Sequence, residues 1–387
     1  MIPAARIQAA IGILDRILAG DPAEAALLRW SRGSRYAGSG DRAAVRDLVF
    51  DSLRRRSSRA ALGGALSGRG LMIGMCREEG LALETVFTGE GHAPALLSEE
   101  EHAAGREPHA QEALDLPEWL WPQWQEALGP HAEGMALALR ERAPVWLRVN
   151  PKKSDPATAI AALAAEGVQA SIVPAIATAL LVEEGARRIS ASSAYRDGLV
   201  ELQDLSPQLA CAALPATGSV LDYCAGGGGK ALAMAARGAG PVSAHDVDAA
   251  RMADLPERAR RAGAKIRLLK PRGIAGRFDL VMTDVPCSGS GTWRRTPDAK
   301  WRLQEADLDR LCALQAAILT EAAETVAEGG VLAYMTCSVL TRENSAQIGA
   351  FLARDARFTL ETEQGYGPEA GFAAGSDGFY LAVLRRR

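Results

Sequence analysis

Two of the six cysteines in this 387-residue chain stand where a thiol could do chemistry. Cys287 and Cys337 are each followed by a serine, and each comes shortly after an apolar run, 278–282 or 331–335. Runs this short and apolar predict buried strands. Because ligands and reactive groups gather where the strands of an open parallel sheet end, the pair predicts one active site with two thiols.

A thiol at a strand end can attack an electron-poor carbon once it has ionised. On a pyrimidine ring, addition at carbon 6 would turn carbon 5 into a nucleophile that can take a methyl group from a sulfonium donor. Release then needs a base to remove the carbon 5 proton before the thiolate is eliminated. Asp284, three residues before Cys287, is placed to hydrogen-bond ring nitrogen N3 and offset the charge that develops there. This chemistry leaves open which of Cys287 and Cys337 attacks and which assists release.

A glycine-rich segment predicts the binding site of a nucleoside cofactor. Glycines let the backbone approach a ligand closely, and a helix start supplies free N–H groups. Asp246 ends the next predicted strand, where an acid can accept hydrogen bonds from ribose hydroxyls. NAD and S-adenosylmethionine both fit this pattern, whereas Ala231 after Lys230 breaks the phosphate-binding loop of ATPases. The segment, which lies between a predicted strand and a predicted helix, is Cys224, Ala225, Gly226, Gly227, Gly228, Gly229 and Lys230.

The residues from about 206 to 387 predict the sheet that positions these groups. Short apolar runs alternate with helical stretches, which favours the α/β class, a parallel sheet with helices on both faces. The predicted strands are 220–224, 242–246, 266–269, 278–283, 331–335 and 379–384. The helices predicted between them begin at Lys230 and Ala249 and continue with 303–327 and 343–354.

The rest of the chain predicts two further sections. Residues 1 to about 135 show helical spacing, and Asp41 is expected to cap a helix N-terminus. Residues from about 140 to 205 alternate strand and helix patterns, which predicts a small α/β module. Trp119 and Trp124 could stack on bases, but packing inside the protein is favoured because such side chains are usually buried.

Composition and charge limit the possible functions. With 48% hydrophobic and 24% charged residues, the chain has the composition of an ordinary soluble protein. The cysteines lack metal-ligand spacing, which predicts free thiols, no metal site and a reducing compartment. No apolar run is long enough for a signal peptide or a membrane span, so we expect a cytoplasmic protein. The net charge of −3 is not typical of a nucleic-acid-binding protein. Clustered arginines could still bind phosphate locally, or they could simply be solvated. The clusters lie at 54–56, 258–261, 294–295 and 385–387.

Several sequence blocks in the last section resemble one family, the RsmB-like (Sun/Fmu) RNA 5-methylcytosine methyltransferases. In the family's order, they are the glycine run 224–230, Asp284-Val285-Pro286-Cys287-Ser288-Gly289-Ser290-Gly291-Thr292, Arg294-Arg295, Thr336-Cys337-Ser338-Val339 and Glu343-Asn344-Ser345. The resemblance implies a class I S-adenosylmethionine-dependent methyltransferase domain, Rossmann-like in fold. It also implies that Cys337 is the nucleophile and that Cys287 assists product release. By the same resemblance, residues 224–230 cradle S-adenosyl-L-methionine, Asp246 contacts its ribose, and Asp284 lies between cofactor and base.

The resemblance also implies an order of domains and a partner. Residues 1–135 would form an all-α NusB-like RNA-binding domain, 140–205 the small α/β module that precedes the catalytic domain, and 206–387 the catalytic domain. The implied reaction is methyl transfer to carbon 5 of a cytosine in RNA. Ribosomal RNA is the expected partner, no membrane is involved, and a monomer is the expected state.

The chain departs from the family in two places. Gly226-Gly227 replaces the usual Ala-Pro, and the stretch 269–273 after the third strand has no acid where family members often carry one. The second departure motivates an alternative function, a catalytically weakened RNA-binding factor for ribosome assembly. A DNA cytosine-5 methyltransferase is the other alternative, and the second thiol at Cys337 argues against it.

Overall fold

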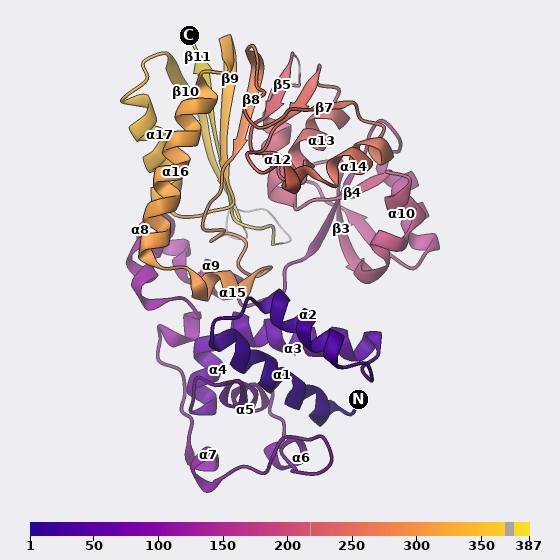
Figure 1. Cartoon of the computed structure of the whole chain (residues 1–387), viewed down its shortest axis with the longest axis vertical. Coiled ribbons are helices and arrows are strands. Elements are labelled where there is room, and N and C mark those ends of the chain that lie inside the picture. The colour runs from indigo at the N-terminus through magenta and orange to yellow at the C-terminus, as the bar shows by residue number, and fades with distance from the viewer. Residues whose placement is uncertain (217, 368–374) are drawn as a thin grey trace. The chain divides into compact units, whose positions relative to one another are not determined.

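The computed structural model describes residues 1–216, 218–367 and 375–387, and the chain divides into two units (Figure 1). The first unit contains Met1–Gln125, Gly129–Arg142 and Trp293–Leu303, and the second contains Glu126–Leu128, Ala143–Thr292 and Gln304–Arg387. This division is coarser than the three predicted sections, whose boundaries stay a prediction.

The first unit is helical, as its sequence pattern predicts. Its helices are α1 (Pro3–Leu18), α2 (Ala23–Gly33), α3 (Ser39–Arg54), α4 (Arg56–Gly63), α5 (Gly68–Glu78), α6 (Leu83–Val86), α7 (Glu99–Ala103), most of α8 (Trp121–Leu128), α9 (Ala132–Ala138) and α15 (Pro297–Arg302). Apolar residues at helical spacing, such as Leu14 in α1 and Val49 in α3, form its buried core. The expectation for Asp41 is wrong: Gly38 is the cap of α3, and Asp41 lies within the first turn, where its carboxylate accepts a hydrogen bond from the Gly38 N–H at 3.1 Å.

The segment Trp293–Leu303 belongs to the helical unit although it follows the Cys287 loop in sequence. The Trp293 ring stacks on Trp124, with 6.0 Å between ring centroids, and both rings are buried. The Lys300 ammonium, also buried, donates to the Arg54 carbonyl at 3.3 Å. The packing role predicted for Trp124 is therefore confirmed, and the chain leaves the second unit after Thr292 and returns to it at Gln304.

The second unit begins with a small antiparallel sheet in the order β2-β3-β1-β4. Its strands are β1 (Val145–Val149), β2 (Gln169–Ile172), β3 (Ala179–Glu184) and β4 (Val200–Leu202), accompanied by α10 (Pro156–Ala165) and α11 (Ser193–Arg196). Leu147, Leu163 and Leu180 lie in its core. The short strands β2 and β4 carry too few apolar residues to be predicted from the sequence.

A seven-stranded sheet in the order β10-β11-β9-β8-β5-β6-β7 forms the rest of the second unit. The strands are β5 (Val220–Asp222), β6 (Val242–Ala244), β7 (Ile266–Leu268), β8 (Phe278–Asp284), β9 (Val326–Thr336), β10 (Phe358–Tyr366) and β11 (Phe379–Arg386). Strands β5 to β9 pair in parallel, whereas β11 runs antiparallel to both β9 and β10. The predicted parallel sheet is present, and β10 is the strand that the sequence did not predict.

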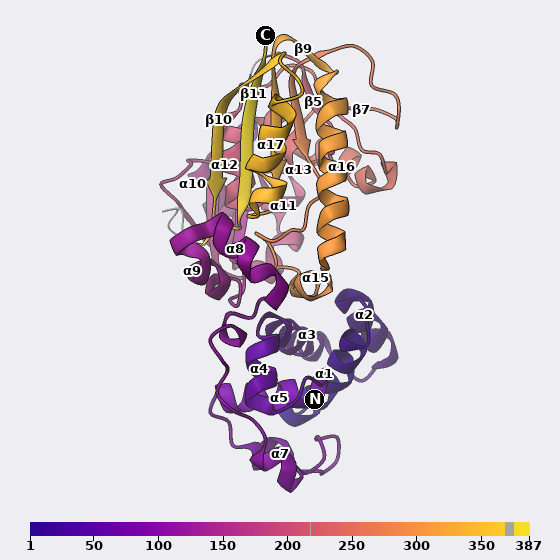
Figure 2. The same ribbon diagram turned by 90° about the vertical axis from the view of Figure 1, so that its left-hand side faces the viewer.

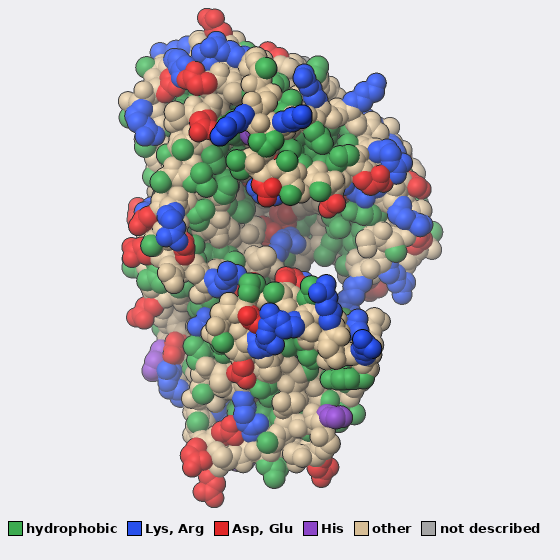
Figure 3. Space-filling model, in the orientation of Figure 1, with side chains coloured by type: hydrophobic (Ala, Val, Ile, Leu, Met, Phe, Trp, Pro, Cys, Tyr) green, Lys and Arg blue, Asp and Glu red, His purple; other side chains and the backbone are tan. Residues whose placement is uncertain are grey.

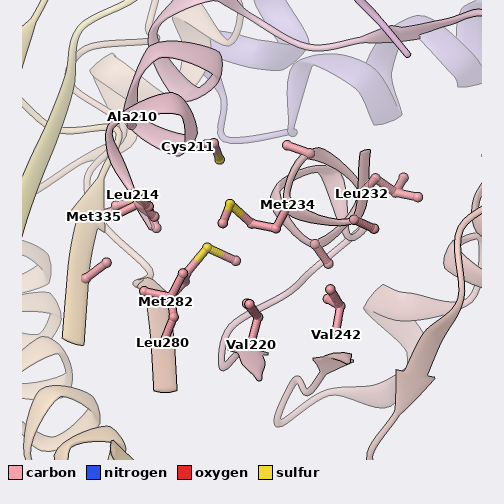
Figure 4. Packing of buried hydrophobic residues seen from close by; sticks show 14 of the residues in the cluster. Ala210, Cys211, Leu214, Val220, Leu232, Met234, Val242, Leu280, Met282 and Met335 are labelled. Carbon is pink, nitrogen blue, oxygen red and sulfur yellow. The ribbon is translucent and has the colours of Figure 1, made fainter. Parts of the chain in front are cut away.

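Helices cover both faces of this sheet (Figure 2). On one face α12 (Leu205–Ala213), α13 (Gly229–Ala236) and α14 (Leu255–Ala262) pack on the sheet. Figure 4 shows residues of α12 and α13 beside Val220, Leu280 and Met282. On the other face α16 (Glu305–Ala323) and α17 (Ser345–Leu352) pack on Val281 and Leu332. Because successive residues of a strand face opposite ways, a strand covered on both faces has apolar residues at consecutive positions, as in Leu280, Val281 and Met282 of β8.

The parallel strands also fix where the candidate site lies. The carboxyl ends of β5, β6, β8 and β9 meet at one edge of the sheet, so the loops that follow them are neighbours. No helix in the described part of the chain is long and apolar enough to cross a membrane.

Candidate active site

The structure brings the two predicted thiols together. Strands β8 and β9 are parallel neighbours, with Asp284 opposite Met335. Cys337 directly follows β9, and Cys287 follows β8 after two intervening residues. Their Sγ atoms lie 3.1 Å apart, within hydrogen-bond distance. A base held at this edge of the sheet would therefore meet both sulfurs at once.

The surroundings of the two thiols differ. The hydrogen bond with Cys287 lowers the pKa of Cys337; burial opposes this shift, while Lys230 and Thr292 add to it. The same hydrogen bond, burial and the nearby Glu343 carboxylate raise the pKa of Cys287. The lowered pKa of Cys337 and the raised pKa of Cys287 make Cys337 the more acidic thiol of the pair.

A partly buried ion pair joins the glycine loop to the Cys287 loop. The Lys230 ammonium donates to the Asp284 carboxylate at 2.5 Å and lies 5.2 Å from the centre of the Phe379 ring. Burial alone would lower the pKa of Lys230, but Asp284 outweighs burial and raises it. Lys230 thus remains a cation beside the thiols, where it favours the thiolate form of Cys337.

The glycine loop has the backbone that its sequence predicts. Gly226 and Gly228 have φ of +50° and +77°, in the left-handed region that favours glycine. A Cβ atom at Gly228 would come within 2.3 Å of the Leu255 side chain, so this position has no room for another residue. Helix α13 begins at Gly229, so the N–H groups of its first turn lie next to the loop.

Asp246 lies beside this loop, and its carboxylate holds the loop in place. One oxygen accepts from the Gly226 N–H at 2.9 Å, and the other accepts from the Asp248 N–H at 3.0 Å. Arg251 approaches the same carboxylate at 3.2 Å. The Ala225 N–H donates to the His245 carbonyl at 2.8 Å, which adds a backbone link between the loop and the end of β6. The predicted contact of Asp246 with a ribose stays a prediction.

Asp222, at the end of β5, was not identified from the sequence. One carboxylate oxygen accepts from the Ala231 N–H at 3.0 Å, and the other is buried with no hydrogen-bond partner among the described residues. Burial raises the pKa of Asp222 to about 7, although the Lys230 cation opposes the shift. An acid at the last position of a strand that leads into a glycine loop is the signal that could have identified it.

These features fit S-adenosylmethionine. Its sulfonium and ammonium groups are cations, and the unpartnered Asp222 oxygen is an acceptor that a cation or a donor would satisfy. The open glycine positions permit close approach of a nucleoside to the backbone. Cys224 lies in the same loop, where burial raises the pKa of its thiol and keeps it neutral.

Glu343 is a second residue whose role the sequence did not indicate. Its side chain is fully buried and accepts four hydrogen bonds. The Ser288 N–H and hydroxyl donate at 2.8 and 2.5 Å, the Ser338 hydroxyl at 2.5 Å, and the Gln315 amide at 2.9 Å. Ser288 follows Cys287 and Ser338 follows Cys337, so one carboxylate fastens the two thiol-bearing loops together.

Comparison with known proteins places this site in a family. Residues 212–385 match the family described as 16S rRNA methyltransferase RsmB/F, and residues 116–187 match the ferredoxin-like domain of RsmF/B-like methyltransferases. The crystal structure of PH0851 matches all of this chain and 99% of its own with a TM-score of 0.75 at 22% identity. NSun6 from Pyrococcus horikoshii with SFG matches 70% of this chain and 98% of its own, with a TM-score of 0.61 at 17% identity. These likenesses confirm the predicted Rossmann-like fold.

Curated relatives are closer in sequence. Ribosomal RNA small subunit methyltransferase B of Xanthomonas campestris pv. campestris is 37% identical over 292 residues, which span 69% of this chain and 66% of that protein. The protein of the same name from Xylella fastidiosa (strain Temecula1) is 33% identical over 386 residues, 89% of each chain. The resemblance seen in the sequence is thereby confirmed: the chain belongs to the RsmB/F family of 16S rRNA methyltransferases.

Proposed function

We propose that this protein transfers a methyl group from S-adenosylmethionine to carbon 5 of a cytosine in ribosomal RNA, through a covalent bond between Cys337 and the base. The observation that carries the proposal is the pair of adjacent thiols with unequal surroundings, at 3.1 Å. Membership of the family supports the methyltransferase activity and the RNA substrate. The monomeric state and the cytoplasmic location stay predictions.

The proposed reaction begins at Cys337. Its thiolate adds to carbon 6 of the cytosine, and the electron pair displaced from the 5,6 double bond makes carbon 5 nucleophilic. The Lys230–Asp284 pair offsets the negative charge that develops toward N3. Residues 224–230, Asp222 and Asp246 would hold S-adenosylmethionine, whose methyl group would be transferred to carbon 5.

Release uses the second thiol. Once Cys337 is bonded to carbon, its negative charge no longer raises the pKa of Cys287, and Cys287 gives its proton to solvent water. Deprotonated Cys287 then removes the proton from carbon 5. The electron pair of that C–H bond restores the 5,6 double bond as the Cys337 thiolate departs, so atoms and charge balance. The two cysteines thus divide attack and release between them.

Labelled S-adenosylmethionine and unmodified ribosomal RNA test this division of roles. We expect Cys337→Ala to form neither product nor adduct, and Cys287→Ala to accumulate a covalent RNA–protein complex. Cys312→Ala is the matched control, because Cys312 is a free thiol in α16 outside the pair. The reverse pattern would exchange the roles of the two cysteines, and full activity of both variants would exclude the covalent mechanism.

One observation favours a second candidate function. The loop after β7 has no acid in residues 269–273, so the adenine side of the cofactor lacks a contact that family members often have. A weakened enzyme that acts as an RNA-binding assembly factor would fit this loss. Calorimetric titration with S-adenosylmethionine separates the two candidates, because the enzyme must bind it and the assembly factor need not.

A further inference from the structure

The edge of the large sheet at β7 carries an unusual set of cations. The segment 264–278 contains five basic residues and no acid, in a chain of net charge −3. All five side chains are exposed, and none forms an ion pair or hydrogen bond within the described part of the chain. They are Lys265, Arg267, Lys270, Arg272 and Arg277.

Several exposed arginines elsewhere in the same unit are paired with acids. Arg310 pairs with Asp307, Arg342 with Asp309, Arg357 with Glu324 and Asp355, and Arg385 with Glu361. Even Arg260 in α14, next to the β7 edge, pairs with Glu257. Unpaired like charges repel one another and disfavour folding slightly, so the absence of acids from this edge has to be explained.

The cations also border a hollow of about 1030 Å³. Lys265, Arg267 and Arg277 line it, as does the paired Arg260, together with apolar residues such as Ile266 and Phe278. Leu268 is 41% exposed. Figure 3 shows blue basic side chains beside green hydrophobic ones over the region where Figure 1 labels β7.

We infer that this edge binds a stretch of the substrate RNA, with phosphates on the cations and an unstacked nucleotide over the apolar hollow. The inference rests on the proposed function, which makes RNA the substrate. Phosphate neutralises cations that have no partner in the protein and releases counterions from the RNA. Single-stranded RNA also exposes base faces that apolar surfaces can cover.

The geometry of β7 suits an extended ligand. Lys265 and Arg267 are two residues apart in extended chain, so their side chains leave the same face of the sheet roughly 7 Å apart. Lys270 and Arg272 continue the series into the following loop, at the stretch where the family acid is absent. The stretch 269–273, which has no acid, thus carries two of the five cations.

The test compares two triple variants with the same change of net charge. Lys265→Gln/Arg267→Gln/Arg277→Gln removes the unpaired cations, and Arg310→Gln/Arg357→Gln/Arg385→Gln removes paired ones from the same unit. The dissociation constant of a labelled ribosomal RNA fragment is measured across a salt series, and methylation is measured at limiting and saturating RNA. A plot of the logarithm of the RNA association constant against log salt should be less steep for the first variant by about 2, because each lost phosphate contact removes roughly 0.7–0.9 from the slope. Its KM for RNA should rise while its rate at saturating RNA stays unchanged, and the control should match wild type.

Several outcomes would overturn the inference. An unchanged salt slope and an unchanged KM for RNA in the first variant would refute the inference. Equal losses of RNA affinity in both variants would show a general effect of charge. Loss of binding to vesicles of anionic lipid with unchanged RNA binding would assign the edge to a membrane instead. The proposed function is judged separately, by wild-type methylation: if wild type methylates RNA and the first variant binds it normally, only the role of the β7 edge fails.

Discussion

Two regions of the large sheet differ in how their polar groups are held: the carboxyl ends of β8 and β9, and the edge strand β7. Where β8 and β9 end, Lys230, Asp284 and Glu343 are mostly or wholly buried and each has a partner. At the β7 edge, five cations are exposed and unpaired within the described chain. Bond making needs groups held in one geometry before the substrate arrives, whereas holding a flexible chain needs charge that can adapt. The difference indicates which residues tolerate change: variants at the buried end should alter rate, and variants at the edge should alter affinity.

The largest expected effect is at Glu343. Replacement by alanine leaves four donors at the thiol loops without an acceptor, and a displacement of about 1 Å in such a site can lower the rate roughly 10²-fold. Glu343→Gln keeps the shape and one acceptor, so we expect partial rescue. Both variants remove a carboxylate that raises the pKa of Cys287, so that thiol should be alkylated at lower pH than in wild type.

Glu361→Ala, which removes an exposed partner of Arg385, is the control for Glu343. Methylation rate, thermal midpoint and the pH dependence of alkylation by iodoacetamide are measured together. A Glu343→Ala protein that keeps the wild-type rate would contradict the distinction between the thiol site and the β7 edge. A lower midpoint with an unchanged Cys287 titration would leave Glu343 only a structural role.

An intermediate effect is expected from the ion pair. Lys230 lowers the pKa of Cys337 and Asp284 raises it, so the two single variants should shift this thiol in opposite directions. In Lys230→Met the alkylation of Cys337 should move to higher pH and methylation at neutral pH should fall. In Asp284→Asn the alkylation should move to lower pH, yet methylation should fall because the carboxylate beside the base is lost.

Mass spectrometry after alkylation at a series of pH values assigns each titration to Cys337 or Cys287. Shifts of the same sign in Lys230→Met and Asp284→Asn would mean that charge does not set the reactivity of Cys337. Cys312 serves as an internal standard in every sample, because it lies outside the ion pair.

The smallest expected effect is that of one edge cation. Arg267→Gln should make the salt dependence of RNA binding less steep by roughly 0.7–0.9 and leave the methylation rate at saturating RNA unchanged. The thermal midpoint should not move, because Arg267 has no protein partner in the described chain. A fall in the saturated rate would show that the β7 edge takes part in the chemistry and would end the contrast drawn between the two regions.

The sequence predicts the parts of the site that lie in continuous motifs. The glycine loop and the two cysteines stand at the ends of apolar strands, and parallel pairing then brings them together. Glu343 could not be assigned in this way, because its four donors come from loops and a helix that only the tertiary fold assembles. Strand β10 was missed because most of its side chains are exposed, so it lacks the apolar pattern that identifies the central strands.

The sequence could not indicate one arrangement within the helical unit, for a related reason. The blocks that follow Cys287 were assigned to the catalytic section because they are adjacent to it in sequence. Trp293, Lys300 and Trp301 instead complete the core and hydrogen bonds of the helical unit. No local pattern distinguishes a tryptophan that packs in its own section from one that packs 170 residues away.

The segment Trp293–Leu303 has a consequence for the order of biosynthesis. A ribosome extends a chain from its N-terminus, and domains made first generally fold first. Here the helices of residues 1–142 cannot bury Trp124 against Trp293, or receive the donors of Lys300 and Trp301 at Arg54 and Leu53, until residue 303 has emerged. The first unit to be synthesised is therefore among the last to be finished, and the newborn chain carries an incomplete helical core throughout the synthesis of β1 to β8.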